Sequence, residues 1–415
     1  MALKYIDPLS LDDPTEGGEE EGEEEGEEEK KKSEEKKKEE EGVWERESQV
    51  PVTVLRAHGA GLTAAHFCFQ DSRLLSSSSD STAVLWDAER CVPLRVFDGG
   101  HGAAISECAV IPDRNRMVTV SWDKKMIAWD LETGQTLWTS SLAGLLTSCS
   151  VSCDGRLVVC AADLQSGVYV SDAASGQTLH HVSDLHRSTI TRCRFDPQSQ
   201  RIATVSADRT IKLWDLVAQK TTVSIDSNHS NVVSNCCFTN NGRFLCTASW
   251  DKTLQLWDLQ TGGFRSRGGA SLRTGHDGSV SSCSFSADAN LLVSSSYDRT
   301  VAVWDMSTLC HTLILKGHSD WVTDVSISAD KKWVASASKD GTLRLWDIEN
   351  LEETPEVMEK RRSHGAGIHI VKCEECGKPF SVSRLETSEL LTKCVFCRLK
   401  SPTRYRPQPP PLMSL

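Results

Sequence analysis

Six times along this chain a histidine is followed 22 residues later by an aspartate and 28 residues later by a Trp-Asp pair. A serine stands two residues before the first aspartate in every set. A unit of 42 to 47 residues that carries Trp-Asp is typical of sheets of four short strands arranged in a ring. The sets are His58/Ser78/Asp80/Trp86, His101/Ser121/Asp123/Trp129, His186/Ser206/Asp208/Trp214, His229/Ser249/Asp251/Trp257, His276/Ser296/Asp298/Trp304 and His318/Ser338/Asp340/Trp346.

Strand and turn signals within one repeat fit this interpretation. In the last repeat, residues 321–328 alternate as an inner strand, residues 333–338 form a second, and residues 343–346 form a third after a turn at Asp340-Gly341. The repeats resemble the WD-repeat family, and the resemblance covers residues 50–349. It implies an all-β fold, a WD-repeat β-propeller of four-stranded blades.

The third repeat departs from the pattern. Ser171-Asp172 stands where Trp-Asp is expected, Asp163 follows two alanines, and the turn between Asp163 and Ser171 is two residues longer than elsewhere. Counting it as a blade keeps the spacing regular, so we expect seven blades. No fourth strand follows Trp346, whereas a β-rich run at residues 50–55 precedes the first histidine. We therefore expect this run to complete the last blade and close the ring, which removes exposed sheet edges.

The resemblance implies that each histidine, serine, aspartate and tryptophan set forms a chain of side-chain hydrogen bonds. A catalytic Ser-His-Asp triad occurs once in a site, whereas this set recurs six times. The sets are therefore interpreted as structural, and we expect no enzyme.

The acidic charge lies in one segment. Residues 16–42 contain 15 Glu and 6 Lys, a local balance of −9 out of the net −12. We expect residues 1–49 to form a disordered, solvated tail, with an acidic arm that contacts basic partners as the alternative. No run suits a signal peptide or a membrane span, so we expect an intracellular protein, in cytoplasm or nucleus, that is not secreted.

Five of the 16 cysteines occupy matching places on inner strands, and we expect them to behave as small buried apolar residues. Packed sheets separate equivalent positions of different blades by roughly 10 Å, beyond the reach of a disulfide. Free thiols in this number favour a reducing compartment. The five are Cys108, Cys149, Cys193, Cys236 and Cys283.

Four further cysteines form two CxxC pairs after the repeats, separated by 17 residues. Two such pairs can place four thiolates around one metal ion, and a segment this short needs a metal to fold. We expect a linker at residues 350–366 and a zinc-ribbon-like module at residues 367–400 with one structural zinc. The predicted ligands are Cys373, Cys376, Cys394 and Cys397.

The C-terminal region also offers contacts for partners. Basic residues around the cysteines leave RNA or DNA as an alternative partner of the zinc module. Residues 401–415 are expected to be a disordered proline-rich tail. Within it, the stretch from Arg404 to Pro410 fits a weak PxxP signal for an SH3-type domain.

The family resemblance implies a non-catalytic scaffold that binds proteins or peptides on the upper face of the ring. Residues just before the turn aspartates project there in the family, and three of the six are aromatic. Aromatic side chains often anchor interfaces, although here they could instead pack on neighbouring turns. An adaptor of a cullin-type ubiquitin ligase is the alternative, although no arginine stands second after any Trp-Asp pair. The predicted partner-binding residues are Trp122, Trp250, Tyr297, Trp321 and Lys339.

Overall fold

The fold is known from a computed structural model, which describes residues 49–112, 114–262, 264–273, 275–351, 354–355 and 357. It also describes two strands, β29 (Ile368–Lys372) and β30 (Pro379–Ser383), which pair antiparallel with each other. The tail at residues 1–48, most of the linker, the four CxxC cysteines and residues 401–415 lie outside the described residues.

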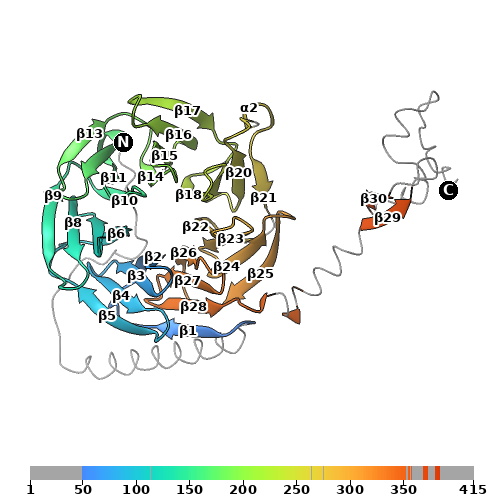
Figure 1. Cartoon of the computed structure of the whole chain (residues 1–415), viewed down its shortest axis with the longest axis horizontal. Helices are drawn as coiled ribbons and strands as arrows, with labels where there is room; N and C mark the ends of the chain where they lie inside the picture. Colours follow the sequence, from blue (N-terminus) through green and yellow to red (C-terminus); the bar gives the residue numbers. More distant parts are fainter. Residues whose placement is uncertain are drawn as a thin grey trace, which may run out of the picture.

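Seven four-stranded antiparallel sheets form a ring around a common axis (Figure 1), which confirms the seven-bladed propeller. Blade one contains β2 (Leu62–Cys68), β3 (Arg73–Ser78), β4 (Ala83–Asp87) and β5 (Val92–Phe97). Blade two contains β6 (Ile105–Ile111), β7 (Arg116–Ser121), β8 (Lys125–Asp130) and β9 (Thr136–Ser141). Blade three contains β10 (Leu146–Val151), β11 (Leu157–Ala162), β12 (Gly167–Asp172) and β13 (Thr178–Val182). Blade four contains β14 (Ile190–Phe195), β15 (Arg201–Ser206), β16 (Thr210–Asp215) and β17 (Lys220–Asp226).

Blade five contains β18 (Val233–Phe238), β19 (Phe244–Ser249), β20 (Leu254–Asp258) and β21 (Ala270–Leu272). A short helix, α2 (Phe264–Arg267), precedes β21 and accounts for the longest interval between tryptophans. Blade six contains β22 (Val280–Phe285), β23 (Leu291–Ser296), β24 (Thr300–Asp305) and β25 (Cys310–Lys316). Blade seven contains β26 (Val322–Ile327), β27 (Trp333–Ser338), β28 (Leu343–Asp347) and β1 (Val52–Leu55).

The predicted closure of the ring is confirmed. Strand β1 pairs antiparallel with β28, with Val52 opposite Trp346 and Leu55 opposite Leu343. The amide of Asp347 also donates a hydrogen bond to the carbonyl of Pro51 at 2.9 Å. The first strand of the chain is therefore the outer strand of the last blade, next to blade one (Figure 1).

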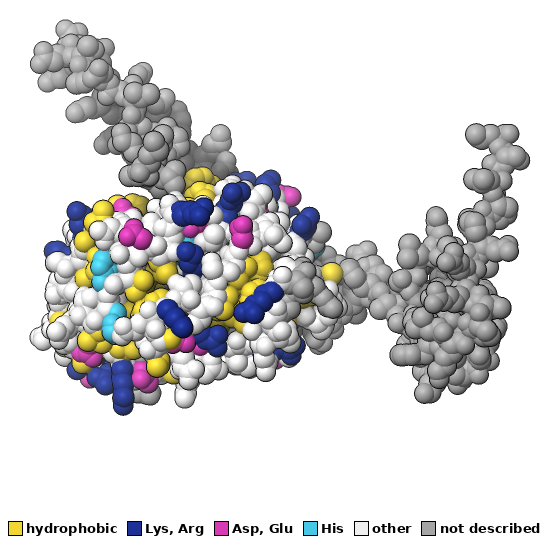
Figure 2. Space-filling view, turned by 90° about the horizontal axis from the view of Figure 1, so that it is seen from above, with side chains coloured by type: hydrophobic (Ala, Val, Ile, Leu, Met, Phe, Trp, Pro, Cys, Tyr) yellow, Lys and Arg dark blue, Asp and Glu magenta, His cyan; other side chains and the backbone are white. Residues whose placement is uncertain are grey.

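The core is divided among the junctions between blades. The described residues form seven buried apolar clusters, and each cluster joins residues of two neighbouring blades. The second strand of each blade is buried almost throughout because it is covered by a blade on either side, as in β7 and β23. The outer strands carry exposed residues, and on the rim apolar side chains are interspersed with basic and acidic ones (Figure 2).

Blade three is a complete sheet despite its irregular sequence. The longer turn after Asp163 contains a 3₁₀ helix, η1 (Leu164–Ser166). The hydroxyl of Ser171, where other blades have tryptophan, is buried and has no hydrogen-bond partner among the described residues. Trp138 of blade two instead reaches over and donates its indole N–H to the carbonyl of Ala173 at 3.1 Å. A neighbouring blade thus supplies a tryptophan contact that blade three lacks.

Candidate interaction surfaces and the central channel

Each regular blade contains a chain of polar side chains that fastens the loop before the inner strand to the turn between the second and third strands. In blade five, Nδ1 of His229 lies 2.9 Å from Oδ2 of Asp251, and Nε2 of the same ring lies 3.0 Å from Oγ1 of Thr247. The indole N–H of Trp257 donates to that hydroxyl at 3.0 Å. Each buried polar side chain in this series of four has a hydrogen-bond partner, which is the condition for a stabilising network.

The serine expected in the chain has a different place. Ser249, two residues before Asp251, donates its hydroxyl to the carbonyl of Val232 at 2.8 Å and accepts the amide of Asp251 at 3.1 Å. Ser249 lies two residues further along β19 than Thr247, at the end of the strand and out of reach of the indole, so the residue four before the aspartate supplies the hydroxyl. The serines whose assignment is corrected are Ser78, Ser121, Ser206, Ser249, Ser296 and Ser338.

The position four residues before the aspartate is serine or threonine in all six regular repeats. The sequence therefore contains a repeated hydroxyl residue from which the correct member of the hydrogen-bonded set could have been predicted. Each of these hydroxyls lies within hydrogen-bond distance of its histidine, at 2.7 to 3.0 Å. In blade three, Val159 occupies this position. The hydroxyl residues are Ser76, Thr119, Thr204, Thr247, Ser294 and Ser336.

The network keeps its aspartates ionised. Burial opposes ionisation of Asp251, but hydrogen bonds from His229 and Thr253 outweigh it and hold the pKa of this carboxyl well below its usual range. The same balance lowers the pKa of Asp340, next to His318 and Thr342. Burial lowers the pKa of His318, and Asp340 only partly offsets this effect. The pairing of an imidazole with a carboxylate is a structural arrangement here, repeated in the six regular blades.

The upper face, which carries these turns, holds a row of three aromatic rings. The Trp250 and Tyr297 ring centroids are 6.4 Å apart, and Tyr297 stacks on Trp321 at 4.8 Å with an interplanar angle of 22°. We call Trp250, Tyr297 and Trp321 the aromatic row; it crosses blades five, six and seven. Trp250 and Tyr297 are half-buried, whereas Trp321 is 47% exposed. The rings thus pack on their neighbours and still present apolar surface.

Two other predicted contact residues flank this face. Lys339 is exposed and lies beside the row, since its amide donates to the carbonyl of Trp321 at 2.9 Å. Its ammonium group donates to the hydroxyl of Ser79 in blade one at 3.2 Å. Trp122 is 44% exposed on the corresponding turn of blade two, so blade one separates it from the row. The aromatic row and Lys339 therefore form one surface, and Trp122 a second.

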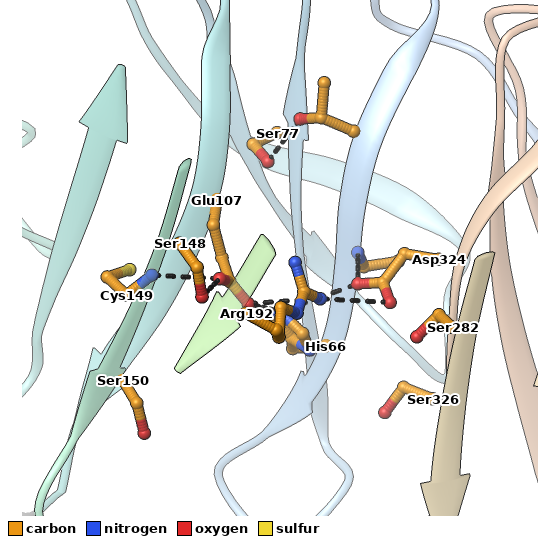
Figure 3. A network of polar contacts seen from close by, with 12 residues as sticks. His66, Ser77, Glu107, Ser148, Cys149, Ser150, Arg192, Ser282, Asp324 and Ser326 are labelled. Carbon is orange, nitrogen blue, oxygen red and sulfur yellow. Dashed lines mark hydrogen bonds and ion pairs between the residues drawn. The ribbon is translucent and has the colours of Figure 1, made fainter. Parts of the chain in front are cut away.

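A buried ionic network, which sequence reasoning missed, lies where the inner strands converge (Figure 3). Nη2 of Arg192 in blade four lies 3.2 Å from Glu107 of blade two and 3.3 Å from Asp324 of blade seven. His66 of blade one lies 3.7 Å from each carboxylate. Although burial opposes ionisation of Glu107, Arg192 and Arg194 lower the pKa of its carboxyl strongly.

The carboxylates of this network also bind backbone amides of the next blade. Glu107 accepts the amide of Cys149 at 2.9 Å, and Asp324 accepts the amide of Ala65 at 3.1 Å. Opposite charges are paired, so the network joins blades rather than attracting a charged ligand. A pocket of about 280 Å³ borders it, lined in part by Glu107, Ser150 and Arg194. These side chains stand on inner strands, six or eight residues after the histidine of their repeats or at the matching places in blade three. Their contacts follow from the geometry of the ring rather than from any local motif.

The five inner-strand cysteines are free and buried, as are several others in the ring. One close contact between thiols of neighbouring blades was not foreseen from the sequence. Although equivalent positions are separated, Sγ of Cys237 in blade five lies only 3.3 Å from Sγ of Cys283 in blade six. These two positions are not equivalent: Cys237 points toward blade six, and Cys283 points back toward blade five.

A fold of seven four-stranded blades with this polar chain defines a WD-repeat propeller. The family model "WD domain, G-beta repeat" matches residues 49–87, 91–130, 177–215, 220–258, 269–305 and 308–347, and the chain belongs to this family. The matched segments omit residues 131–176, which contain the first three strands of blade three, in agreement with its missing tryptophan.

The chain is similar to human WD repeat-containing protein 88, with 50% identity over 354 residues, 85% of this chain and 75% of that protein. It is also similar to the target of rapamycin complex subunit wat1 of Schizosaccharomyces pombe, with 26% identity over 40% of this chain and 54% of that protein. The U5 small nuclear ribonucleoprotein 40 kDa protein of Dictyostelium discoideum is 25% identical over 42% of this chain and 50% of its own length. Such propellers typically act as protein-interaction scaffolds, and no enzyme family is indicated.

In the described part of the chain, no helix is both long and apolar enough to cross a membrane.

Proposed function

We propose that this protein is a non-catalytic scaffold that binds a protein or peptide partner on the upper face of its propeller. The aromatic row and Lys339 would form the main contact, and Trp122 a second one. The observation that carries the proposal is the continuous contact between Trp250, Tyr297 and Trp321, which leaves Trp321 47% exposed. Tryptophan and tyrosine dominate the binding energy of many interfaces because they bury large areas with few rotatable bonds.

The surroundings of the row favour a particular kind of partner. The blades beneath it are rigid, so little ordering entropy would be lost on binding. Lys339 adds a positive charge beside Trp321. An apolar side chain next to an acidic residue would match this combination, and we expect such a segment in the partner.

The test compares two variants of the full chain in affinity purification from cells, followed by mass spectrometry. The double variant Tyr297→Ala/Trp321→Ala removes the exposed end of the row. Leu179→Ala, on the rim strand β13 and 48% exposed, removes a comparably exposed apolar group elsewhere. Partners should be lost from the first variant only. The same partners with both variants would contradict the proposal, whereas recovery of cullin-ligase subunits would favour the adaptor alternative.

We also propose that residues 367–400 bind one structural zinc ion through Cys373, Cys376, Cys394 and Cys397. The pairing of β29 with β30 supports this, because the first CxxC pair stands between these strands, where a hairpin would present both thiolates. Metal analysis should find one zinc per chain, and Cys376→Ser should lose it. Cys153→Ser, at an exposed propeller thiol, should retain it. Equal zinc content in the two variants would contradict the assignment.

This module would be the second contact surface of the scaffold. Its basic residues leave RNA or DNA as the alternative ligand class. Crosslinking of nucleic acid to the full chain, lost in Cys376→Ser, would favour that alternative over a protein contact.

A further inference from the structure

The propeller repeats one arrangement of three side chains at all seven junctions between blades. The first comes from an inner strand, the second lies opposite it on the second strand, and the third comes from the inner strand of the next blade. Six junctions have at most one cysteine in these positions. Their sets are His66/Leu75/Cys108, Ala109/Val118/Cys149, Ser150/Val159/Cys193, Arg194/Ala203/Cys236, Ser284/Val293/Val325 and Ser326/Ala335/Ala65.

The junction between blades five and six differs because all three positions are cysteine. Cys237 on β18 is paired with Cys246 on β19, and Cys283 on β22 faces them both. The three sulfur atoms all lie within 4.8 Å of one another, and Cys237 and Cys283 are 3.3 Å apart. In the described residues, no fourth thiol, imidazole or carboxylate joins this cluster. We call Cys237, Cys246 and Cys283 the thiol cluster.

The surroundings of the thiol cluster are largely apolar. Cys246 and Cys283 belong to a buried apolar cluster that includes Trp304, and Cys237 is half-buried.

We propose that the thiol cluster is a three-coordinate site for Cu(I). Thiolate sulfur is the soft ligand that Cu(I) prefers, and three sulfurs without a fourth donor suit it better than zinc, whose structural sites are four-coordinate. On binding, Cu(I) would release to solvent the protons of those thiols that are still protonated. Since Cys237 is half-buried, the metal ion would reach the cluster on its side.

The site would join two blades. Cys237 and Cys246 belong to blade five and Cys283 to blade six, so a bound ion would crosslink neighbouring sheets. Because only the folded ring brings the three sulfurs together, binding should stabilise the propeller, by an amount that rises with the logarithm of the affinity.

The test uses the full chain with Cys373, Cys376, Cys394 and Cys397 all replaced by serine, so that these thiols take up no metal. Without oxygen and with all thiols reduced, Cu(I) is titrated in competition with a chromogenic Cu(I) chelator. One equivalent should bind, and X-ray absorption should report three sulfur neighbours. Cys246→Ser in the same background should weaken binding by at least about tenfold. Cys193→Ser, which removes the buried thiol of a one-cysteine junction, should leave it unchanged.

A second variant guards against loss of the fold. If circular dichroism shows that Cys246→Ser is unfolded, Cys237→Ala, at the half-buried position, should bind Cu(I) equally weakly while remaining folded. Equal uptake by a folded cluster variant and by Cys193→Ser would overturn the proposal. So would a background protein that takes up no Cu(I), that binds zinc in preference to Cu(I), or that holds the ion by two sulfurs only.

Discussion

Oε1 of Glu107 in blade two lies 2.6 Å from Nη2 of Arg194 in blade four, although blade three stands between these blades in the ring. The guanidinium of Arg194 also donates to the carbonyl of Cys149 in blade three at 2.8 Å. One carboxylate therefore helps to hold three consecutive blades, including the blade that lacks the polar chain of the others.

Replacing Glu107 should be costly because the buried Arg192 and the half-buried Arg194 both depend on it. Glu107→Gln removes the charge while keeping the shape, and it leaves Arg192 and Arg194 with less compensation. We expect a loss of about 3 kcal/mol in the free energy of unfolding, measured by urea denaturation. Glu132→Gln, at an exposed carboxylate, serves as the control and should change it by less than about 0.5 kcal/mol. Similar losses for both would show that the network contributes little.

The corrected place of the hydroxyl can be tested in blade five. Thr247→Val keeps the side-chain shape but removes the group that meets both His229 and Trp257. Two buried polar groups lose a partner, so we expect a loss of roughly 1–3 kcal/mol in chemical denaturation. Thr222→Val, at an exposed threonine of the outer strand β17 whose hydroxyl donates to the carbonyl of Leu213, is the control and should cost clearly less. Indistinguishable denaturation midpoints would count against this account of the chain.

The turn aspartates should differ between regular and irregular blades. Asp251 meets His229, Thr253 and the amide of Ser230, whereas Asp163 accepts the amide of Leu145 and has no histidine 22 residues before it. Asp251→Ala should therefore cost roughly 1–3 kcal/mol and Asp163→Ala less. Calorimetry of the two variants gives the comparison, and a larger decrease in melting temperature for Asp163→Ala would refute the ranking.

Acid should weaken the ring in two stages. The pKa values of His58, His101 and His318 are lowered by burial, so below about pH 6.5 the unfolded chain takes up protons that the folded chain does not, and stability falls. The turn aspartates have lowered pKa values, so their contribution is complete above about pH 4 and is lost below it. Urea denaturation at about pH 7.5, 5.5 and 3.5 should show both losses. His318→Gln should show a smaller first loss, and a profile unchanged by this substitution would argue against the first stage.

The closing strand should be needed for an intact ring. Removing residues 1–48 leaves β1 in place and should leave the melting temperature nearly unchanged, whereas removing residues 1–55 deletes β1 and exposes the edge of β28. An exposed edge invites pairing between chains, so we expect aggregation of the shorter chain in size-exclusion chromatography. Two truncated chains that both elute as monomers and melt alike would disprove the role of β1.

Much of the fold could be predicted from the sequence because each blade repeats the same local rules. The spacing of Trp86, Trp129, Ser171 and Trp214 gave the number of blades even where the tryptophan is missing. The β-rich run around Val52 gave the closure, since the last repeat has no fourth strand of its own. These inferences depend on period and strand alternation, which a sequence displays directly.

The contacts between blades could not be predicted in the same way. Glu107, Arg192 and Asp324 lie far apart in the sequence. They meet because each stands six residues after the histidine of its repeat, at the same depth of the central channel. The contact of Cys237 with Cys283 likewise depends on which face of a strand turns toward the next blade. The contacts within the aromatic row depend on side-chain conformation as well as on ring position.

The pairing of Val52 with Trp346 also affects how the chain folds during synthesis. Among the strands of the propeller, β1 leaves the ribosome first, and it has no partner until almost all the blades have been translated. Its backbone groups must stay unpaired for that time, and closing so long a loop is slow. The propeller should therefore depend on chaperones most strongly in the interval before β28 emerges. During that interval the ring is nearly complete but is not yet closed by the pairing of β1 with β28.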